Sequence, residues 1–320
     1  MRKAVLECVY DLAKADERIF FIGSDLGEGT MAQFKRDMPG RFLMEGISEA
    51  NVIGMAAGLA LEGRIPYVNT IATFLTRRCF EHLAIDLCLH NVRVRLIGNG
   101  GGMVYAPLGP THLAVEDMAI LRALPNMTIV APADAGEMCR LMPQTVEYPG
   151  PIYIRVAKGY DPIVTSADTP FQIGKGQLLR EGRDALLVTT GITLKIAQAA
   201  AEALNSTGIA AGILHMPTIK PFDVPLLLDA AVKVRAVVSI EEHTIVGGLG
   251  SAVAEVLAEA CFASPLRFRR IGIPDVFPDQ YGSQDSLMAK YQITVAGVTR
   301  TVEDLLGLGA SPSTATSTGE

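Results

Sequence analysis

The chain has 320 residues and a mass of 34.1 kDa, a length that predicts two domains rather than one. Hydrophobic residues make up 49% of it, charged residues make up 19%, and the mean hydropathy is +0.29, so a disordered or collagen-like chain is excluded. With 28 basic against 34 acidic residues the net charge is -6, which argues against nucleic acid or an anionic membrane as a partner.

The cysteines and the hydropathy pattern indicate where the protein acts. Five cysteines occur, an odd number, and none forms a C-x-x-C pair, so we expect neither a disulfide framework nor a zinc site. The first twelve residues carry charges at helical spacing, and no segment has eighteen consecutive apolar residues. The sequence therefore predicts a cytoplasmic protein without a signal peptide or a membrane span.

Short runs rich in Val, Ile and Leu alternate with helical patterns through the first half. The runs expected to form buried strands are residues 19–23, 65–71, 92–98, 127–131 and 152–156. Between them, Ser48 is expected to cap a helix of small residues, and residues 74–90 are expected to form a second helix. Strands alternating with helices of this length predict an α/β fold, a parallel sheet covered on both faces.

A second α/β unit follows a break in the pattern. Residues 158–183 are rich in Gly, Pro, Asp and Thr, the composition of a linker. The alternation then resumes, with strands expected over 185–190, 210–215 and 236–240 and helices over 195–204, after Asp223 and over 251–260. We expect a first domain over residues 1–160, a linker over 161–183, a smaller second doubly wound domain over 184–306 and a disordered tail over 307–320.

Single polar residues leave their roles open. Glu49 stands in the first turn of a predicted helix, where a carboxylate complements the helix dipole, and Glu45 has the same ambiguity. His112 follows the glycine-rich residues 98–102, and irregular loops of this kind often hold ligands. A P-loop, a dinucleotide-binding G-x-G-x-x-G and a hydrolase G-x-S-x-G are all absent from the sequence.

The combination of motifs is more informative than any single residue. In chain order they read MEGISEAN (44–51), ATFLTRRCFEH (72–82), GPTHLAVED (109–117), VAPAD (130–134), PTIKPFD (217–223), EEHTIVGGLGSAVAE (241–255) and GIPD (272–275). Over about residues 1–306 this series resembles the pyrimidine-binding and C-terminal domains of transketolases, which use thiamine diphosphate. The resemblance implies the two-domain α/β architecture expected above.

One motif of that family is missing. Its members hold the cofactor's diphosphate and Mg²⁺ through Gly-Asp-Gly and a later Asn-containing segment, and this sequence has no Gly-Asp-Gly. The chain thus resembles the C-terminal subunit of a split transketolase. The resemblance implies a separate N-terminal subunit with the Gly-Asp-Gly motif, an α2β2 complex, and metal ligands on the partner rather than on this chain.

The resemblance also assigns roles to residues. The matched catalytic residues are Glu49, which in this family hydrogen-bonds the aminopyrimidine ring and promotes loss of the thiazolium C2 proton, and His112, which faces the substrate's oxygens. Positions matched to cofactor binding are Ile47, Glu49, Phe74, Arg78 and Phe80. Positions matched to substrate binding are Ser24, Asp25, Leu108 and His112.

The match is incomplete around the substrate. Typical transketolases have an aspartate four residues before the histidine, where this chain has Leu108, and residues 99–102 occupy the place of an upstream phosphate-binding histidine. Arg155 matches a phosphate-binding arginine only loosely. We therefore expect ordinary sugar phosphates to be poor acceptors. The cluster formed by Glu241, Glu242 and His243 is expected at an interface rather than in catalysis.

The expected reaction is transfer of a two-carbon ketol unit from a ketose donor to an aldehyde acceptor. Two alternatives stay open at this point. One is the β subunit of a 2-oxo acid decarboxylating dehydrogenase, which shares both domains. The other is a catalytically silent scaffold subunit whose pocket serves binding or assembly.

Overall fold

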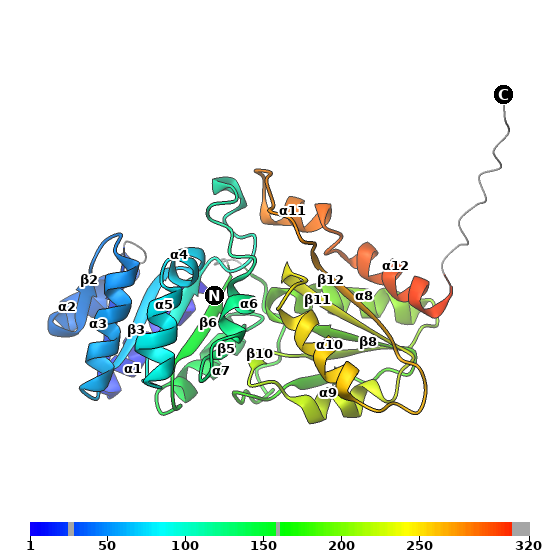
Figure 1. Cartoon of the computed structure of the whole chain (residues 1–320), viewed down its shortest axis with the longest axis horizontal. Helices are drawn as coiled ribbons and strands as arrows, with labels where there is room; N and C mark the ends of the chain where they lie inside the picture. Colours follow the sequence, from blue (N-terminus) through cyan, green and yellow to red (C-terminus); the bar gives the residue numbers. More distant parts are fainter. Residues whose placement is uncertain (25–28, 158–160, 309–320) are drawn as a thin grey trace.

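Two α/β units lie side by side in the computed structural model, which describes residues 1–24, 29–157 and 161–308 (Figure 1). Each unit is built on its own sheet, so the expectation of two doubly wound sheets is confirmed. No helix within these ranges is long and apolar enough to cross a membrane.

The first sheet has seven strands in the order β10-β5-β6-β4-β3-β1-β2. Their bounds are β1 Ile19–Gly23, β2 Phe42–Met44, β3 Ile65–Ile71, β4 Arg95–Asn99, β5 Thr128–Val130, β6 Ile152–Val156 and β10 Thr218–Lys220. All neighbours pair in parallel except β10, which is antiparallel to β5. The central strands are almost continuously buried because helices cover both faces.

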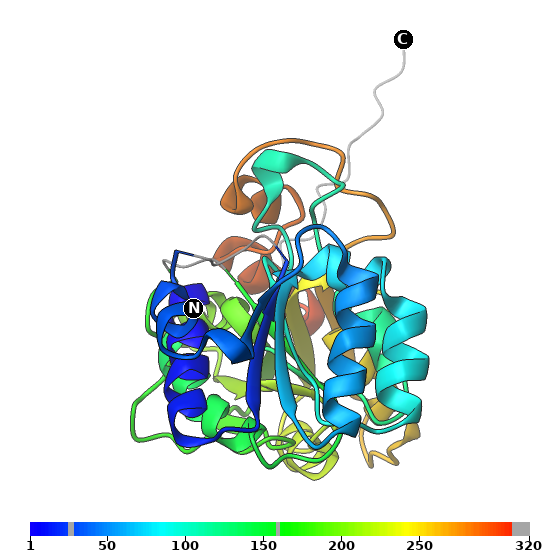
Figure 2. The same cartoon turned by 90° about the vertical axis from the view of Figure 1, so that its left-hand side faces the viewer.

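Helices α1 and α7 cover one face of this sheet, and α3, α6 and the π-helix η2 cover the other (Figure 2). The helices are α1 Arg2–Ala15, α2 Ala32–Asp37, α3 Glu49–Leu61, α4 Ala72–Arg77, α5 Phe80–His82, α6 Asp117–Arg122 and α7 Ala135–Thr145. Shorter elements are the 3₁₀ turns η1 Pro39–Arg41 and η3 Ala106–Leu108 and the π-helix η2 Leu83–Leu89.

Two local predictions about helices need correction. Ser48 occupies the N-cap of α3, but its hydroxyl donates to the carbonyl of Glu45 at 2.8 Å instead of capping the helix. The helix predicted over 74–90 begins at Ala72 and is interrupted at Cys79, whose ψ of 8° leaves the helical range. It continues through α5 into the π-helix, whose wider turns differ from the α-helical period.

The second sheet has the order β12-β11-β8-β9-β7. Its elements are β7 Gln177–Arg180, β8 Ala185–Thr189, η4 Gly191–Thr193, α8 Leu194–Ser206, β9 Ala211–His215, α9 Val224–Ala231, β11 Ala236–Thr244, α10 Leu249–Glu259, β12 Arg267–Ile273, α11 Gln284–Lys290 and α12 Val295–Leu306. Strand β7 lies within the segment interpreted as a linker, because its antiparallel pairing with β9 is a tertiary contact that local composition does not reveal. Of the predicted tail, residues 309–320 lie outside the described ranges.

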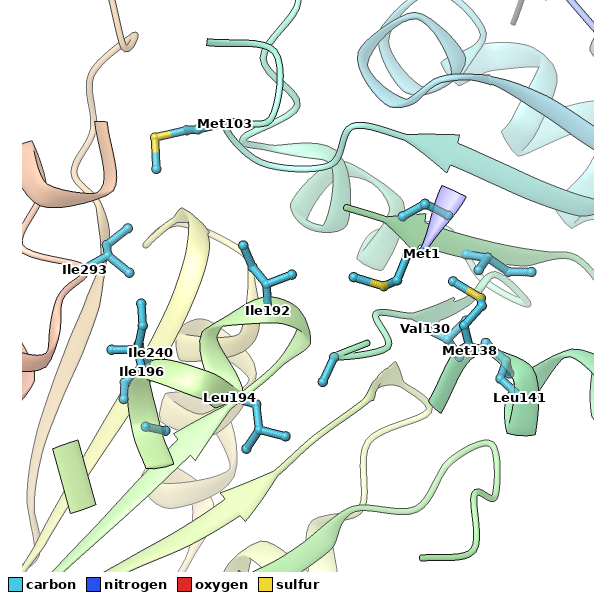
Figure 3. Packing of buried hydrophobic residues seen from close by; sticks show 14 of the residues in the cluster. Met1, Met103, Val130, Met138, Leu141, Ile192, Leu194, Ile196, Ile240 and Ile293 are labelled. Carbon is cyan, nitrogen blue, oxygen red and sulfur yellow. The ribbon is translucent and has the colours of Figure 1, made fainter. Parts of the chain in front are cut away.

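The two units share one packed boundary. Strand β10 follows β9 along the chain yet extends the first sheet, beside β5. A single hydrophobic cluster spans both units and includes Met103, Ile192, Ile240 and Ile293 (Figure 3). Such a continuous core fixes the carboxyl edge of the first sheet relative to the second unit.

This carboxyl edge contains a topological switch point. Strand β1 has β2 on one side and β3 on the other. The connection from β1 to β2 therefore runs to one side of β1, and the next connection, from β2 to β3, returns to its other side. The last residue of β1, Gly23, is in register with Met44 and Asn69. Parallel α/β sheets bind their ligands at the carboxyl ends of strands around such a point.

Candidate active site

Glu49 begins α3 at this edge, and its side chain is only 6% exposed. Its Oε2 accepts a hydrogen bond from Nη1 of Arg78 at 3.1 Å. Within the described ranges, Arg78 is the only residue that donates to this carboxylate. The second carboxylate oxygen is therefore able to accept a donor from a ligand.

Arg78 connects Glu49 to two aromatic rings. The guanidinium carbon lies 3.9 Å from the centroid of the Phe74 ring, a cation–π contact. The Phe74 ring in turn contacts the His112 ring at a centroid distance of 5.2 Å and an interplanar angle of 66°. Four residues from three motifs of the sequence thus form one continuous group.

Burial and charge keep the thiol next to this group neutral. The pKa of Cys79 is raised to about 12, mainly by burial and also by the nearby Glu49 carboxylate, while Arg78 opposes the shift. An un-ionised thiol adds an apolar wall rather than a nucleophile. In the described part of the chain, no group of three or more His, Cys, Asp or Glu side chains is placed to hold a metal ion.

Buried polar side chains line the ends of the central strands. Ser24 follows β1, and its hydroxyl donates to Thr70 Oγ1 at 2.8 Å. Asn99 at the end of β4 donates through Nδ2 to Asn69 Oδ1 on β3 at 2.6 Å. The sequence analysis did not single out either asparagine. A polar Asn near the end of an otherwise apolar strand pattern could have indicated that this strand end lies at a ligand site. Asp25 lies outside the described residues.

Three predicted site residues are exposed apolar side chains outside the group that contains Glu49. Ile47 is 75% exposed, Phe80 37% and Leu108 49%. Ile47 lies two residues before the start of α3, Phe80 begins α5, and Leu108 ends η3 in the loop that leads to His112. Exposed large apolar side chains beside a polar site are typical of a surface that another molecule covers.

Arg155, the loosely matched phosphate ligand, is engaged within the protein. Its Nε donates to Asp117 at 2.8 Å, and its Nη2 donates to Asp117 and to the carbonyls of Ala114 and Glu242. The side chain is only 8% exposed and Asp117 is fully buried. Arg155 therefore joins the two units of the fold instead of facing a ligand.

Comparisons with known proteins agree with this geometry. Residues 1–160 match the family model "Transketolase, pyrimidine binding domain" and residues 174–298 match "Transketolase, C-terminal domain". The chain is 35% identical over 306 residues to the 6-deoxy-6-sulfo-D-fructose transketolase subunit SqwH of Clostridium sp. (strain MSTE9), covering 95% of this chain and 94% of that one. It is 34% identical to one of the subunits of the apulose-4-phosphate transketolase of Phocaeicola vulgatus, covering 94% of this chain and 95% of that one.

A longer relative and a solved structure extend the comparison. The 1-deoxy-D-xylulose-5-phosphate synthase of Heliobacterium modesticaldum is 36% identical, covering 92% of this chain but only 45% of that protein. A solved split-gene transketolase, described as an inactive β4 tetramer, superimposes with a TM-score of 0.87 at 36% identity, covering 97% of this chain and 99% of that one.

The chain therefore belongs to the transketolase family of thiamine diphosphate-dependent enzymes. Within that family it corresponds to the C-terminal subunit of a split transketolase, and hence to a subunit of a ketol-transferring enzyme. The resemblance inferred from the motifs is confirmed.

The residues at the switch point fit the pyrimidine half of the cofactor. The largely buried side chain of Glu49 has a second carboxylate oxygen that accepts no hydrogen bond from the described residues, which suits the donor groups of an aminopyrimidine. Phe74, which packs against Arg78, offers an aromatic ring suited to a flat heterocycle. The diphosphate half has no such counterpart among the described residues, which hold no metal-binding cluster.

Proposed function

We propose that this chain supplies the pyrimidine-binding half of a thiamine diphosphate site and that a separate N-terminal subunit supplies the diphosphate and Mg²⁺ ligands. The observation that carries the proposal is the largely buried Glu49 carboxylate at the switch point, which accepts a hydrogen bond from Arg78 on one oxygen and leaves the other oxygen available as an acceptor. The missing Gly-Asp-Gly motif supports the partner's role. The free cysteines suit a cytoplasmic location.

The residues of this chain have distinct proposed tasks. When bound, thiamine diphosphate supplies the carbanion chemistry that moves a two-carbon unit from a ketose to an aldehyde. Glu49 shares a proton with the aminopyrimidine ring, a task favoured by its burial. Phe74 and Phe80 orient the ring, and His112 donates to substrate oxygens as negative charge develops on them. Ser24, Asp25 and Leu108 border the substrate, and Ile47 and Arg78 border the cofactor.

Reconstitution tests the assembly. The lone chain should show neither ketol transfer nor tight, Mg²⁺-dependent thiamine diphosphate binding by calorimetry, and adding an N-terminal subunit with Gly-Asp-Gly should restore both. We expect an α2β2 mass for the active species. The inactivity stated for the β4 tetramer of the structural neighbour is consistent with this expectation. Tight cofactor binding by the lone chain would overturn the proposal that the partner subunit supplies the diphosphate and Mg²⁺ ligands.

Leu108 points to a specialised acceptor. A leucine cannot accept a hydrogen bond, so a sugar hydroxyl buried against it lacks a partner and loses about 1–3 kcal/mol of binding. This equals roughly ten- to a hundredfold in specificity. We therefore expect deoxy or unphosphorylated aldehydes to react with a higher kcat/KM than ribose 5-phosphate when the two-subunit complex is assayed. A preference for ribose 5-phosphate would refute this role for Leu108.

A further inference from the structure

The loop that carries Leu108 and His112 is closed at its base by a backbone pair. The Gly102 amide donates to the Ala114 carbonyl at 2.8 Å, and the Ala114 amide donates back to Gly102 at 3.0 Å. Residues 103–113 between them form consecutive tight turns closed by backbone hydrogen bonds, and one of these turns is the 3₁₀ turn η3. Such turns fix the local shape of the loop, so its placement over the site depends on contacts with other segments.

The second unit provides such a contact through Glu242 of β11. Its Oε1 accepts the Met103 amide at 2.7 Å and Nε2 of Gln284 at 2.9 Å. The Glu242 side chain is 2% exposed. A Cβ placed on Gly102, which has φ +72°, would lie 2.4 Å from the Glu242 carboxyl carbon, so only glycine lets this carboxylate pack so closely.

The same unit also contacts the far end of the loop. Gly109, with φ +78°, lies under the Tyr281 ring, and a Cβ there would be 2.8 Å from that ring's Cε1 atom. Tyr281 precedes α11 and Gln284 is the first residue of this helix, which lies beside the loop in both views (Figures 1 and 2). The loop is thus held by the second unit at two points.

We propose that Glu242 is a positioning residue for the reaction: its carboxylate anchors the first amide of the loop so that His112, at the loop's other end, is held against Phe74 in the site. The loop's two ends are fixed by different contacts, Met103 by Glu242 and His112 by the ring of Phe74. This role rests on the proposed function of His112. It gives the second unit, which places no predicted site residue, an indirect part in catalysis through the position of His112.

Glu241 provides a matched control. It neighbours Glu242 on β11 and is equally buried, but its carboxylate accepts the amides of Leu249 and Gly250 at 2.7 and 2.8 Å, at the start of α10. Successive strand residues point to opposite faces, which explains the different targets. Removing either carboxylate leaves buried amides without an acceptor, but only the Glu242 variant does so in the loop.

The experiment compares Glu242→Ala, Glu242→Gln and Glu241→Ala by hydrogen–deuterium exchange on the full chain and by kinetics of the two-subunit complex. In Glu242→Ala, peptides covering residues 103–113 should exchange roughly tenfold faster or more, because the Met103 amide loses its acceptor. In Glu242→Gln the amide oxygen still accepts, so exchange and kcat should return to near the parent values. Glu241→Ala should instead speed exchange at the start of α10.

Kinetics then separate positioning from general destabilisation. Glu242→Ala should lower kcat at least about tenfold with little change in the KM of thiamine diphosphate, whereas Glu241→Ala should keep kcat within about twofold. Unchanged loop exchange in Glu242→Ala, or equal loss of kcat in both alanine variants, would overturn the proposal. Because the exchange measurement needs no substrate, it remains decisive even if the complex lacks ketol transfer.

Discussion

At the scale of single residues, the site depends on contacts that connect distant motifs. Glu49, Arg78, Phe74 and His112 were assigned to the site by resemblance alone. The structure adds that the guanidinium of Arg78 bridges the carboxylate and the Phe74 ring, and that this ring touches His112. Side-chain contacts between separate loops cannot be inferred from one sequence, because no local period relates the partners.

Replacing Glu49 tests the central assignment. Glu49→Gln keeps the side chain's size but removes the group that shares a proton with the pyrimidine, so thiazolium C2 hydrogen–deuterium exchange in the reconstituted complex should slow roughly a hundredfold or more. Glu45→Gln is the control, because Glu45 is exposed and should have little effect. An unchanged exchange rate in Glu49→Gln would show that another group performs this task.

At the scale of helices and strands, the reliability of the sequence predictions follows burial. The bounds of β1, β3 and β6 were predicted correctly, because each is a mostly apolar run of the length expected for a buried strand. Strands β7 and β10 were missed, since both are short edge strands defined by antiparallel partners elsewhere in the chain. The π-helix was missed because its first residues read as a continuous α-helix.

Strand β11 makes the stability of the protein depend on pH. Burial raises the pKa of Glu242 to about 7, although the charge of Arg155 and hydrogen bonds from Gln284 and Met103 oppose this shift and the charge of Asp117 adds to it. The ordinary value is 4.5, so between these values the folded chain binds more protons than the unfolded one. The contribution of this carboxyl is complete below pH 4.5 and is lost as pH rises through about 7.

The difference in the free energy of unfolding between the parent and Glu242→Gln should therefore be smaller at about pH 8 than at about pH 5, because only the parent loses the contribution of this carboxyl as pH rises. The largest difference expected in the free energy of unfolding is about 3 kcal/mol, measured by urea denaturation of both chains. Burial lowers the pKa of His243 to about 4, which has the opposite pH dependence, but His243 is present in both chains and cancels. Parallel stability profiles for parent and variant would contradict this prediction.

At the scale of the whole molecule, the two-domain organisation was predictable but the interface was not. Chain length and the alternation of strand and helix patterns predicted two α/β units, and Glu241, Glu242 and His243 were expected at an interface. The sequence did not reveal that Arg155 and Asp117 meet this strand as a buried ion pair. Buried charges require partners, yet only the fold determines which residues those partners are.

One exposed apolar face indicates the docking surface for the N-terminal subunit. The face includes Phe80 of α5 and two residues of the π-helix, Ile85 and Leu89. The Ile85 and Leu89 side chains are 48% and 71% exposed. Ile47, two residues before Glu49 in the sequence, is also exposed. Since the proposed site needs a partner directly next to Glu49, we expect the partner to cover this face.

Placing charge on this face should prevent assembly without unfolding the chain. In the double variant Ile85→Glu and Leu89→Glu, two carboxylates would be buried unpaired at the contact, so the Kd of the complex should rise roughly thirtyfold or more and cofactor binding should fall with it. Val232→Glu is the control, because Val232 is 67% exposed at the end of α9 in the second unit. Analytical ultracentrifugation of each variant with the N-terminal subunit measures the Kd. If the double variant assembles as tightly as the control, the partner docks elsewhere, and the site must be completed from another side.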